Sequence, residues 1–397
     1  MNKVYVIGTC DTKEAELRYA VERVRAAGGE PKLVDISTTP STAVADVTPD
    51  MVARHHAKGA NAVLGHSDRG LAVMAMGEAL TAYLLSRNDI GAVLGLGGGG
   101  NTSIVTAAMR ALPIGMPKLM VSTMASGNVA PYVGPTDIAM MHAVADVAGL
   151  NAITRKVIGN AAHAAAGMAM NAVPEIAETK RAVGLTMFGV TTACITQIRH
   201  LLEAENECFV FHATGTGGQC MEKLIDSGLL TAVLDITTTE VADHLFGGVL
   251  PCTEDRFGSV IRRRIPYVGS VGAVDMVNFG GRETVPPQFE GRNLYVHNPQ
   301  VTLMRTTPED NRAIGQWIVE RINRVEGPVR FLLPLQGVSA IDARGKPFHD
   351  PQADHALFDA IRSGWVAAPN RRLIEIDAHI NDPAFAEAAV HAHKEIA

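Results

Sequence analysis

The strongest chemical signal in the sequence is a run of four glycines followed by small polar residues. This segment consists of Gly97, Gly98, Gly99, Gly100, Asn101, Thr102 and Ser103. Glycines allow the backbone to approach a phosphate closely and to direct several N–H groups at it. A helix that starts directly after them adds its positive N-terminal end. We therefore predict a cradle for a phosphate or a carboxylate, although a tight turn that needs glycine only for close packing would have the same sequence.

One residue departs from the nucleotide-binding pattern that this spacing resembles. The spacing matches the P-loop, in which a lysine reaches the terminal phosphates, but Asn101 stands where that lysine should be. The segment therefore carries no positive charge of its own, and the charge beside a phosphate must come from elsewhere in the fold or from a metal ion. A P-loop NTPase is not predicted.

A second, weaker glycine-rich turn lies in the other half of the chain. It consists of Thr214, Gly215, Thr216, Gly217 and Gly218. The glycines free the backbone and the threonines offer hydroxyl groups, so this turn is a second candidate for binding the same kind of ligand.

The turn after the first predicted strand carries a third group of candidates. Thr9, Asp11 and Lys13 follow residues 4–7, at the end of a strand where open parallel sheets bind ligands. Asp11 could hold a magnesium ion or a ribose hydroxyl, and Lys13 could contact a phosphate. The alternative is that Asp11 only caps the first helix, with Glu14 completing a capping box.

Other polar residues at predicted strand ends offer weaker signals. His66 and Arg69 follow one predicted strand, and His212 precedes the second glycine turn. Asp235 and Glu240 flank a threonine-rich turn and could bind a metal or hydroxyl groups. Interior, structurally satisfied side chains are the alternative at each of these positions.

The composition restricts the class of protein. With 397 residues, 47% hydrophobic and 19% charged, the chain can bury more than one core. The net charge of -6 gives no reason to expect a general nucleic-acid binder. The five cysteines form no CxxC pair, and the N-terminus has no export signal. We expect a cytoplasmic protein with reduced thiols, no bound nucleic acid and no membrane segment.

Short apolar segments that alternate with helical patterns predict the architecture. Residues 94–123 and 210–239 each give a strand, a glycine-rich turn, a helix, a strand and a hydroxyl-rich turn, in that order. We therefore predict an α/β fold with two Rossmann-like lobes, residues 1–178 and 179–397. Both lobes would contain mainly parallel sheets, with a cleft between the lobes.

Three further segments complete this prediction. Residues 61–64 are predicted to form a short strand, and residues 138–172 an almost continuous helical region, rich in Ala and Met and low in charge. Because such a surface is poorly suited to solvent, we expect the part around residues 138–170 to form a homodimer interface. Residues 175–180 are predicted to link the lobes.

Four of these segments together resemble a known family. Residues 6–14, 95–103, 123–127 and 211–219 are similar to the motifs of the tomato mosaic virus resistance protein family, whose N-terminal domain binds ATP. The resemblance spans the chain and implies two Rossmann-like subdomains, ATP with Mg²⁺ near the glycine-rich segments, and a homodimer. Plant members carry a further TIM-barrel-like domain, which would here have to be a separate partner protein.

The motifs and the family resemblance leave three alternatives for the function of this protein. The preferred one is an ATP-dependent enzyme, or a subunit of one, that acts on an unknown small-molecule substrate. The second is a non-catalytic nucleotide-binding module that engages a protein partner. The third is a sugar-phosphate or dinucleotide enzyme, although the first turn lacks the GxGxxG pattern and only Asp35 could serve as a ribose-binding acid.

Overall fold

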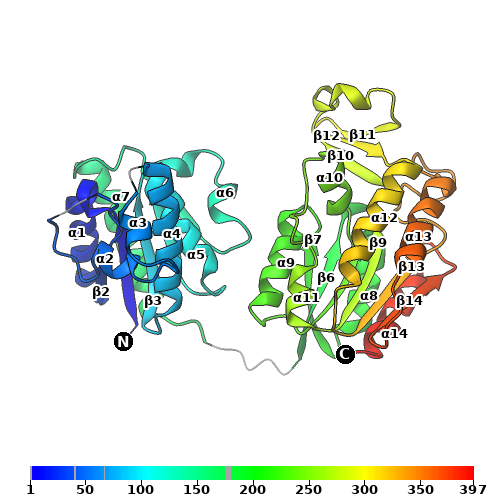
Figure 1. Cartoon of the computed structure of the whole chain (residues 1–397), viewed down its shortest axis with the longest axis horizontal. Helices are drawn as coiled ribbons and strands as arrows, with labels where there is room; N and C mark the ends of the chain where they lie inside the picture. Colours follow the sequence, from blue (N-terminus) through cyan, green and yellow to red (C-terminus); the bar gives the residue numbers. More distant parts are fainter. Residues whose placement is uncertain (1, 40–41, 67, 175–179) are drawn as a thin grey trace. The chain divides into compact units, whose positions relative to one another are not determined.

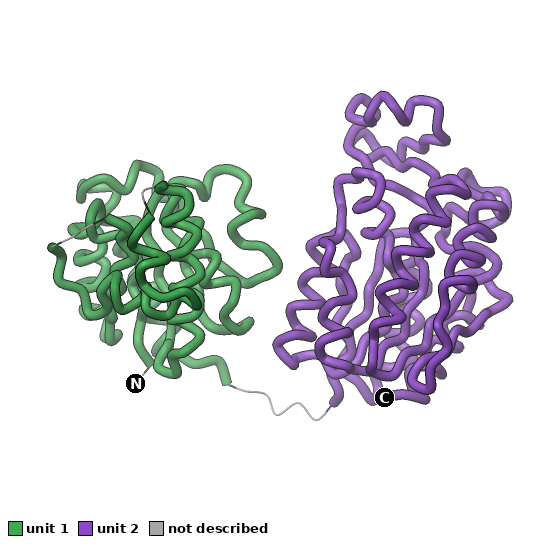
Figure 2. The backbone as a smooth tube through the Cα atoms, in the orientation of Figure 1, with its two compact units in different colours: residues 1–176 green, residues 177–397 purple. Residues whose placement is uncertain are grey.

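The chain is divided into two compact units, each with its own sheet. The computed structural model describes residues 2–39, 42–66, 68–174 and 180–397. Unit 1 is Met1–Ile176 and unit 2 is Ala177–Ala397 (Figure 2). Of the predicted linker 175–180, only Lys180 lies among the described residues.

Unit 1 is built on a five-stranded, fully parallel sheet with the order β2-β1-β3-β4-β5. Its strands are β1 (Lys3–Gly8), β2 (Pro31–Asp35), β3 (Ile90–Gly97), β4 (Lys118–Ser122) and β5 (Ala139–His142). The chain leaves β1 for one edge and then returns to β3 on its other side. In such sheets ligands bind outside the carboxyl ends of the two strands at the switch, here β1 and β3.

Helices cover both faces of this sheet. They are α1 (Cys10–Ala26), α2 (Pro49–Ala53), α3 (Asn61–Leu64), α4 (Arg69–Leu85), α5 (Gly99–Ala111), η1 (Thr123–Ser126), α6 (Ala130–Val133) and α7 (Ala152–Met170). Alternate residues of β1 pack on opposite faces: Val4 and Val6 lie in the core with α1 and α7, whereas Tyr5 and Ile7 lie in the core with α4 and α5. This two-sided burial explains why β3 is apolar along its whole length.

Unit 2 has a six-stranded, fully parallel sheet with the order β14-β13-β9-β8-β6-β7. Its strands are β6 (Arg181–Met187), β7 (Asn206–His212), β8 (Ala232–Thr237), β9 (Tyr267–Gly272), β13 (Val329–Pro334) and β14 (Arg371–Ile376). A smaller antiparallel sheet contains β10 (Met276–Phe279), β11 (Leu294–Asn298) and β12 (Val301–Arg305) (Figure 1).

The helices of unit 2 also form two layers. They are η2 (Gly189–Thr191), α8 (Thr192–Leu202), α9 (Thr216–Asp226), α10 (Glu240–Phe246), α11 (Gly258–Arg263), η3 (Arg282–Thr284), η4 (Pro287–Phe289), α12 (Pro308–Ile322), α13 (Pro351–Gly364) and α14 (Pro383–Lys394). One core contains α8 and α14, and the other contains α9, α12 and α13. The predicted fold class, two Rossmann-like lobes with mainly parallel sheets, is confirmed. The cleft between them stays a prediction.

Two local predictions were wrong. Residues 61–64 form helix α3 instead of a strand, and only Val63 of this segment is buried. Within residues 138–172, β5 pairs in parallel with β4, and a helix starts only at Ala152. That start has a capping box in which Asn151 accepts from the amides of Ile153 and Thr154. Among the described residues, no helix is long and apolar enough to span a bilayer.

The low charge of the Ala-rich segment has an explanation within unit 1. Ala161, Ala162, Ala165 and Ala166 of α7 are buried in the core that this helix forms with α1 and the sheet. Packing inside one unit therefore explains these four alanines, and the homodimer stays a prediction.

Candidate functional site

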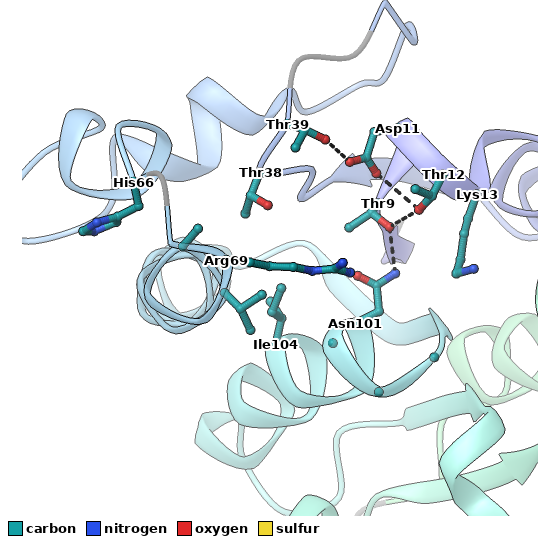
Figure 3. A pocket seen from close by; sticks show the side chains of 15 residues that line it. Thr9, Asp11, Thr12, Lys13, Thr38, Thr39, His66, Arg69, Asn101 and Ile104 are labelled. Atoms are coloured by element: carbon teal, nitrogen blue, oxygen red, sulfur yellow. Dashed lines mark hydrogen bonds between the residues drawn. The ribbon is translucent and has the colours of Figure 1, made fainter.

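A pocket of about 500 Å³ opens in unit 1 at the carboxyl ends of β1 and β3 (Figure 3). It is lined by Thr9, Asp11, Thr12, Lys13, Thr38, Thr39, His66, Arg69, Ala72, Val73, Gly98, Gly99, Gly100, Asn101 and Ile104. The turn after β1, the segment after β2, the start of α4 and the start of α5 therefore meet at one place. This is the switch point at which sheets of this kind bind ligands.

The N-terminus of α5 presents unpaired backbone donors to this pocket. The first hydrogen bond of the helix runs from the Thr102 amide to the Gly98 carbonyl, at 2.9 Å. The amides of Gly99, Gly100 and Asn101 have no acceptor among the described residues. Together with the helix dipole, these N–H groups form an anion-binding arrangement.

The glycines of this turn are not required by packing. A Cβ on Gly98 would lie 3.7 Å from the nearest protein atom, and a Cβ on Gly99 would lie 3.8 Å away. A Cβ on Gly100 would meet nothing within 4 Å. Gly97 differs, because its φ of +154° and a Cβ only 2.5 Å from Asn101 both demand glycine. Residues 98–100 therefore leave free space for a ligand, which packing alone does not explain.

Asn101, at the position of the P-loop lysine, is held rigidly in the pocket wall. Its Nδ2 donates to the Leu96 carbonyl at 3.0 Å and to Thr9 Oγ1 at 3.2 Å. The residue is only 7% exposed, yet its Oδ1 has no hydrogen-bond partner among the described residues. An unpaired acceptor at this depth indicates a place for a donor from a ligand or a mobile side chain.

The next two residues, Thr102 and Ser103, do not line the pocket. Thr102 is fully buried, and its Oγ1 donates to the Gly98 carbonyl at 2.8 Å and lies 2.6 Å from Ser122 Oγ. Ser103 Oγ donates to the Gly99 carbonyl at 3.0 Å. The two hydroxyls therefore bind carbonyl groups of the glycine turn and leave its amide groups free to bind a ligand.

The turn after β1 is satisfied internally. The amide of Cys10 donates to Asp35 Oδ1 at 3.0 Å, and the amide of Asp11 donates to Ser37 Oγ at 3.0 Å. Asp35 is 1% exposed, so it is committed to this turn and is not available to a ribose. Burial raises the pKa of the Cys10 thiol to about 12, which makes it a poor nucleophile.

The carboxylate of Asp11 faces the pocket. It accepts hydrogen bonds from Thr12 Oγ1, at 3.3 Å, and from Thr39 Oγ1 (Figure 3). The N-cap of α1 is Thr9, and Glu14 pairs with Arg18, so the capping-box alternative for Asp11 is wrong. Among the described residues, no group of three His, Cys, Asp or Glu side chains could hold a metal. A Mg²⁺ here would have to be shared between Asp11, a ligand and water.

Two basic side chains line the pocket. Lys13 Nζ donates to the carbonyl of Val147, in the loop before α7. The side chain of Arg69, at the start of α4, reaches across the pocket toward Asn101, whereas the His66 ring points away from it (Figure 3). Thr12, Thr38 and Thr39 were not among the predicted binding residues. Arg69 was only a weaker candidate, from its position after residues 61–64, which form α3 instead of the predicted strand.

The second glycine-rich turn lies in unit 2 and is filled by a carboxylate of the same unit. The amides of Gly215 and Gly218 donate to Glu240 Oε1 at 2.9 and 3.1 Å. A Cβ on Gly217 would lie 1.7 Å from the His212 carbonyl, and a Cβ on Gly218 would lie 2.4 Å from the Glu240 carboxylate. Glycine is therefore required here by internal packing. Thr214 and Thr216 belong to the same turn, and a ligand role for it stays a prediction.

Glu240 belongs to a buried charge network. Arg256 pairs with Asp235 at 2.8 Å and with Glu240 at 2.9 Å, and Glu222 lies 3.5 Å away. Burial alone would lower the pKa of Arg256, but the three carboxylates raise it well above its usual value. Burial raises the pKa of Glu222 to about 7. Asp235 and Glu240, candidates for metal binding, thus neutralise an interior arginine.

Comparisons with known proteins identify relatives of the whole chain. The model of the uncharacterised protein family UPF0261 N-terminal domain matches residues 2–174, and that of its C-terminal domain matches residues 180–397. A UPF0261 protein of Rhizobium meliloti is 57% identical over 100% of both chains. A UPF0261 protein of Clostridium tetani is 42% identical over 97% of this chain and 96% of its own.

A plant protein is also similar. The ToMV resistance protein Tm-1 of Solanum lycopersicum is 41% identical over 99% of this chain and 56% of its own length. The resemblance predicted from the four motifs is therefore confirmed.

Proposed function

Since the chain belongs to the UPF0261 family, whose relatives include the tomato ToMV resistance protein, we propose that it binds ATP in the unit 1 pocket. The unpaired amides of Gly99, Gly100 and Asn101 at the start of α5 carry this proposal, because they need an acceptor and lie where Rossmann-like sheets bind nucleotides. An ATP-dependent enzyme of small-molecule metabolism, or a subunit of one, is the function that we infer.

The phosphates belong at the start of α5. Gly98, Gly99 and Gly100, which no described protein atom crowds, allow close approach of the phosphates, and the helix end favours negative charge. Ala72, Val73 and Ile104 form an apolar part of the same pocket, which is suited to one face of the adenine ring. The pocket volume of about 500 Å³ is within the range of small-molecule sites.

Mg²⁺ fits the donors that this pocket offers. Magnesium in nucleotide sites commonly takes one or two carboxylates, the substrate phosphates and water. Asp11 supplies one carboxylate, with Thr9, Thr12 and Thr39 hydroxyls beside it. When bound, the ion would neutralise phosphate charge, while Asp11 would hold it on the β1 side of the pocket.

The test is titration calorimetry of the full chain with ATP, ADP and AMP, each with Mg²⁺ and again with EDTA. We expect ATP with Mg²⁺ to bind most tightly and AMP least tightly. An absence of heat with millimolar ATP, together with an unchanged melting temperature, would refute the proposal. Slow ATP turnover that rises with a metabolite would identify an enzyme.

A binding module is the second candidate. The tomato relative is covered over only 56% of its length, so the matched region is joined there to further sequence. In this alternative for the present chain, ATP would control association with another protein, such as a TIM-barrel partner. ATP binding without turnover, with nucleotide-dependent capture of such a partner, would favour this candidate.

A further inference from the structure

The charge that the glycine-rich segment lacks has a source elsewhere in unit 1. We propose that Arg69 supplies the cation missing at position 101, and that Asn101 orients it by accepting a guanidinium N–H on Oδ1. This assignment rests on the proposed nucleotide site and extends it. It makes the pocket a two-sided clamp, with α5 amides on one side of a phosphate and a guanidinium on the other.

Arg69 is placed and free to act in this way. It is the first residue of α4, whose N-cap Asp68 accepts from the Leu71 amide at 2.9 Å, so the backbone below the side chain is fixed. The side chain is exposed, lines the pocket and extends toward Asn101 (Figure 3). No ion pair or hydrogen bond joins it to another described residue. Its charge is therefore not neutralised within the part of unit 1 that the structure describes.

Lys13, the other basic residue of the pocket, is committed differently. Its Nζ donates to the carbonyl of Val147, in the loop before α7. To reach a phosphate it would first have to leave that acceptor. Arg69 has no such contact to lose, which makes it the better candidate for the primary phosphate ligand.

The anchoring of Asn101 accounts for an asparagine at this position. The Leu96 carbonyl can only accept a hydrogen bond, so the amide atom of Asn101 that contacts it must be the donor Nδ2. The other amide atom, Oδ1, is therefore the one left without a partner among the described residues. The guanidinium of Arg69 is the donor that points toward it (Figure 3). A lysine at position 101 would lose this anchor and place a second cation beside Arg69. Asn101 thus acts as a positioning residue.

This arrangement defines the ligand by its chemistry. A guanidinium contacts two oxygens of one phosphate as a planar fork, while the α5 amides contact oxygens on the opposite side. A single terminal phosphate has three free oxygens, so two in the fork leave one for the three α5 amides, whereas two linked phosphates supply acceptors for both partners. Loss of Arg69 should therefore reduce the affinity for ATP and ADP more than the affinity for AMP.

The experiment is titration calorimetry of the full chain with ATP and Mg²⁺, on the parent and on Arg69→Gln, Arg69→Lys, Asn101→Ala and Arg69→Gln/Asn101→Ala. We expect Arg69→Gln to weaken ATP binding on the order of 100-fold, since a bidentate, charge-assisted contact is lost. Arg69→Lys should recover part of this loss. Arg54→Gln is the matched control, because it removes an exposed charge of unit 1 outside the pocket and should change the affinity less than about twofold.

The double-mutant cycle of Arg69 and Asn101 tests whether Asn101 positions Arg69 or only stabilises the turn. If Asn101 acts through Arg69, Asn101→Ala should cost roughly tenfold in the parent and little in the Arg69→Gln background. Additive losses would refute the positioning role. Parent-like ATP affinity in a folded Arg69→Gln variant would refute the Arg69 assignment but leave the nucleotide site standing. A parent that binds no ATP would overturn both.

Discussion

Gly100 provides a test in which stability and binding should change in opposite directions. It occupies the first turn of α5, it is exposed, and an added Cβ would meet no protein atom within 4 Å. Alanine is favoured over glycine in helices by about 0.5–1 kcal/mol, so Gly100→Ala should raise the melting temperature of unit 1 by roughly 1–4 °C. The same Cβ would enter the space in which we place the phosphate.

The binding loss can be sized from the contacts involved. If the Cβ displaces the phosphate from one charge-assisted amide, the loss of about 1.5–3 kcal/mol weakens ATP roughly tenfold to a hundredfold. Gly98→Val should cost more, because its larger side chain would fill more of the space in which we place the phosphate, while the Cβ itself would come no closer than 3.7 Å to Thr123 Oγ1. Calorimetry with ATP and Mg²⁺ measures the affinity, and thermal melts measure the stability.

Gly167→Ala is the matched control for this pair of effects. Gly167 lies within α7, and its Cβ would also meet nothing within 4 Å, but it does not line the pocket. It should gain stability and keep its ATP affinity. If Gly100→Ala melts higher and binds ATP as tightly as the parent, the α5 amides do not hold the phosphate and the reasoning fails.

Three further predictions follow from the same contacts. Asp11→Asn should weaken ATP binding in Mg²⁺ but hardly in EDTA, which calorimetry in the two buffers compares; equal losses in both would argue against a metal ligand. Glu240→Ala should destabilise unit 2 by about 3–5 kcal/mol in urea unfolding, because Arg256 loses a buried partner; a parent-like midpoint would contradict this. The pKa of Glu222 is about 7 in the folded state, above its ordinary value of 4.5, so the folded state binds this proton more tightly than the unfolded state. The contribution of Glu222 to the free energy of unfolding therefore falls as pH rises from about 4.5 to 7. Glu222→Gln should therefore gain stability relative to the parent over that range, by on the order of 3 kcal/mol, and a constant difference between pH 4.5 and 8 would refute it.

Much of the unit 1 site could be predicted because its signals are local in sequence. The glycines, Asn101 and the helix start stand side by side in the chain, and the alternation of strands and helices places them at the end of β3. Arg69 was harder to assign, since nothing in its neighbours shows that α4 starts beside α5. The failure at residues 139–142 has a related cause: an Ala-Met-Met-His segment has no strand signal of its own and pairs only because β4 offers an open edge.

The occupancy of each turn could not be predicted, because the acceptors come from distant parts of the chain. Asp35 lies 25 residues beyond Cys10, and Glu240 lies 25 residues beyond Gly215. Each carboxylate reaches its turn only after the intervening helix and strand have folded. A sequence pattern therefore shows that such a turn offers backbone N–H donors. It does not show whether a carboxylate of the same protein already accepts from them.

That distinction separates the three turns chemically. Amides that are already paired with an internal carboxylate would have to exchange that carboxylate for a phosphate. In unit 2, displacing Glu240 in this way would also remove an ion-pair partner from the buried Arg256. The loss of a buried ion-pair partner costs several kcal/mol, which the new contact would have to exceed. The α5 amides face no such exchange, because only solvent competes for them, and the nearby cation Arg69 has no described partner to give up. On this argument a ligand gains the full value of the contact at α5 alone, and for this reason we propose the nucleotide site in unit 1.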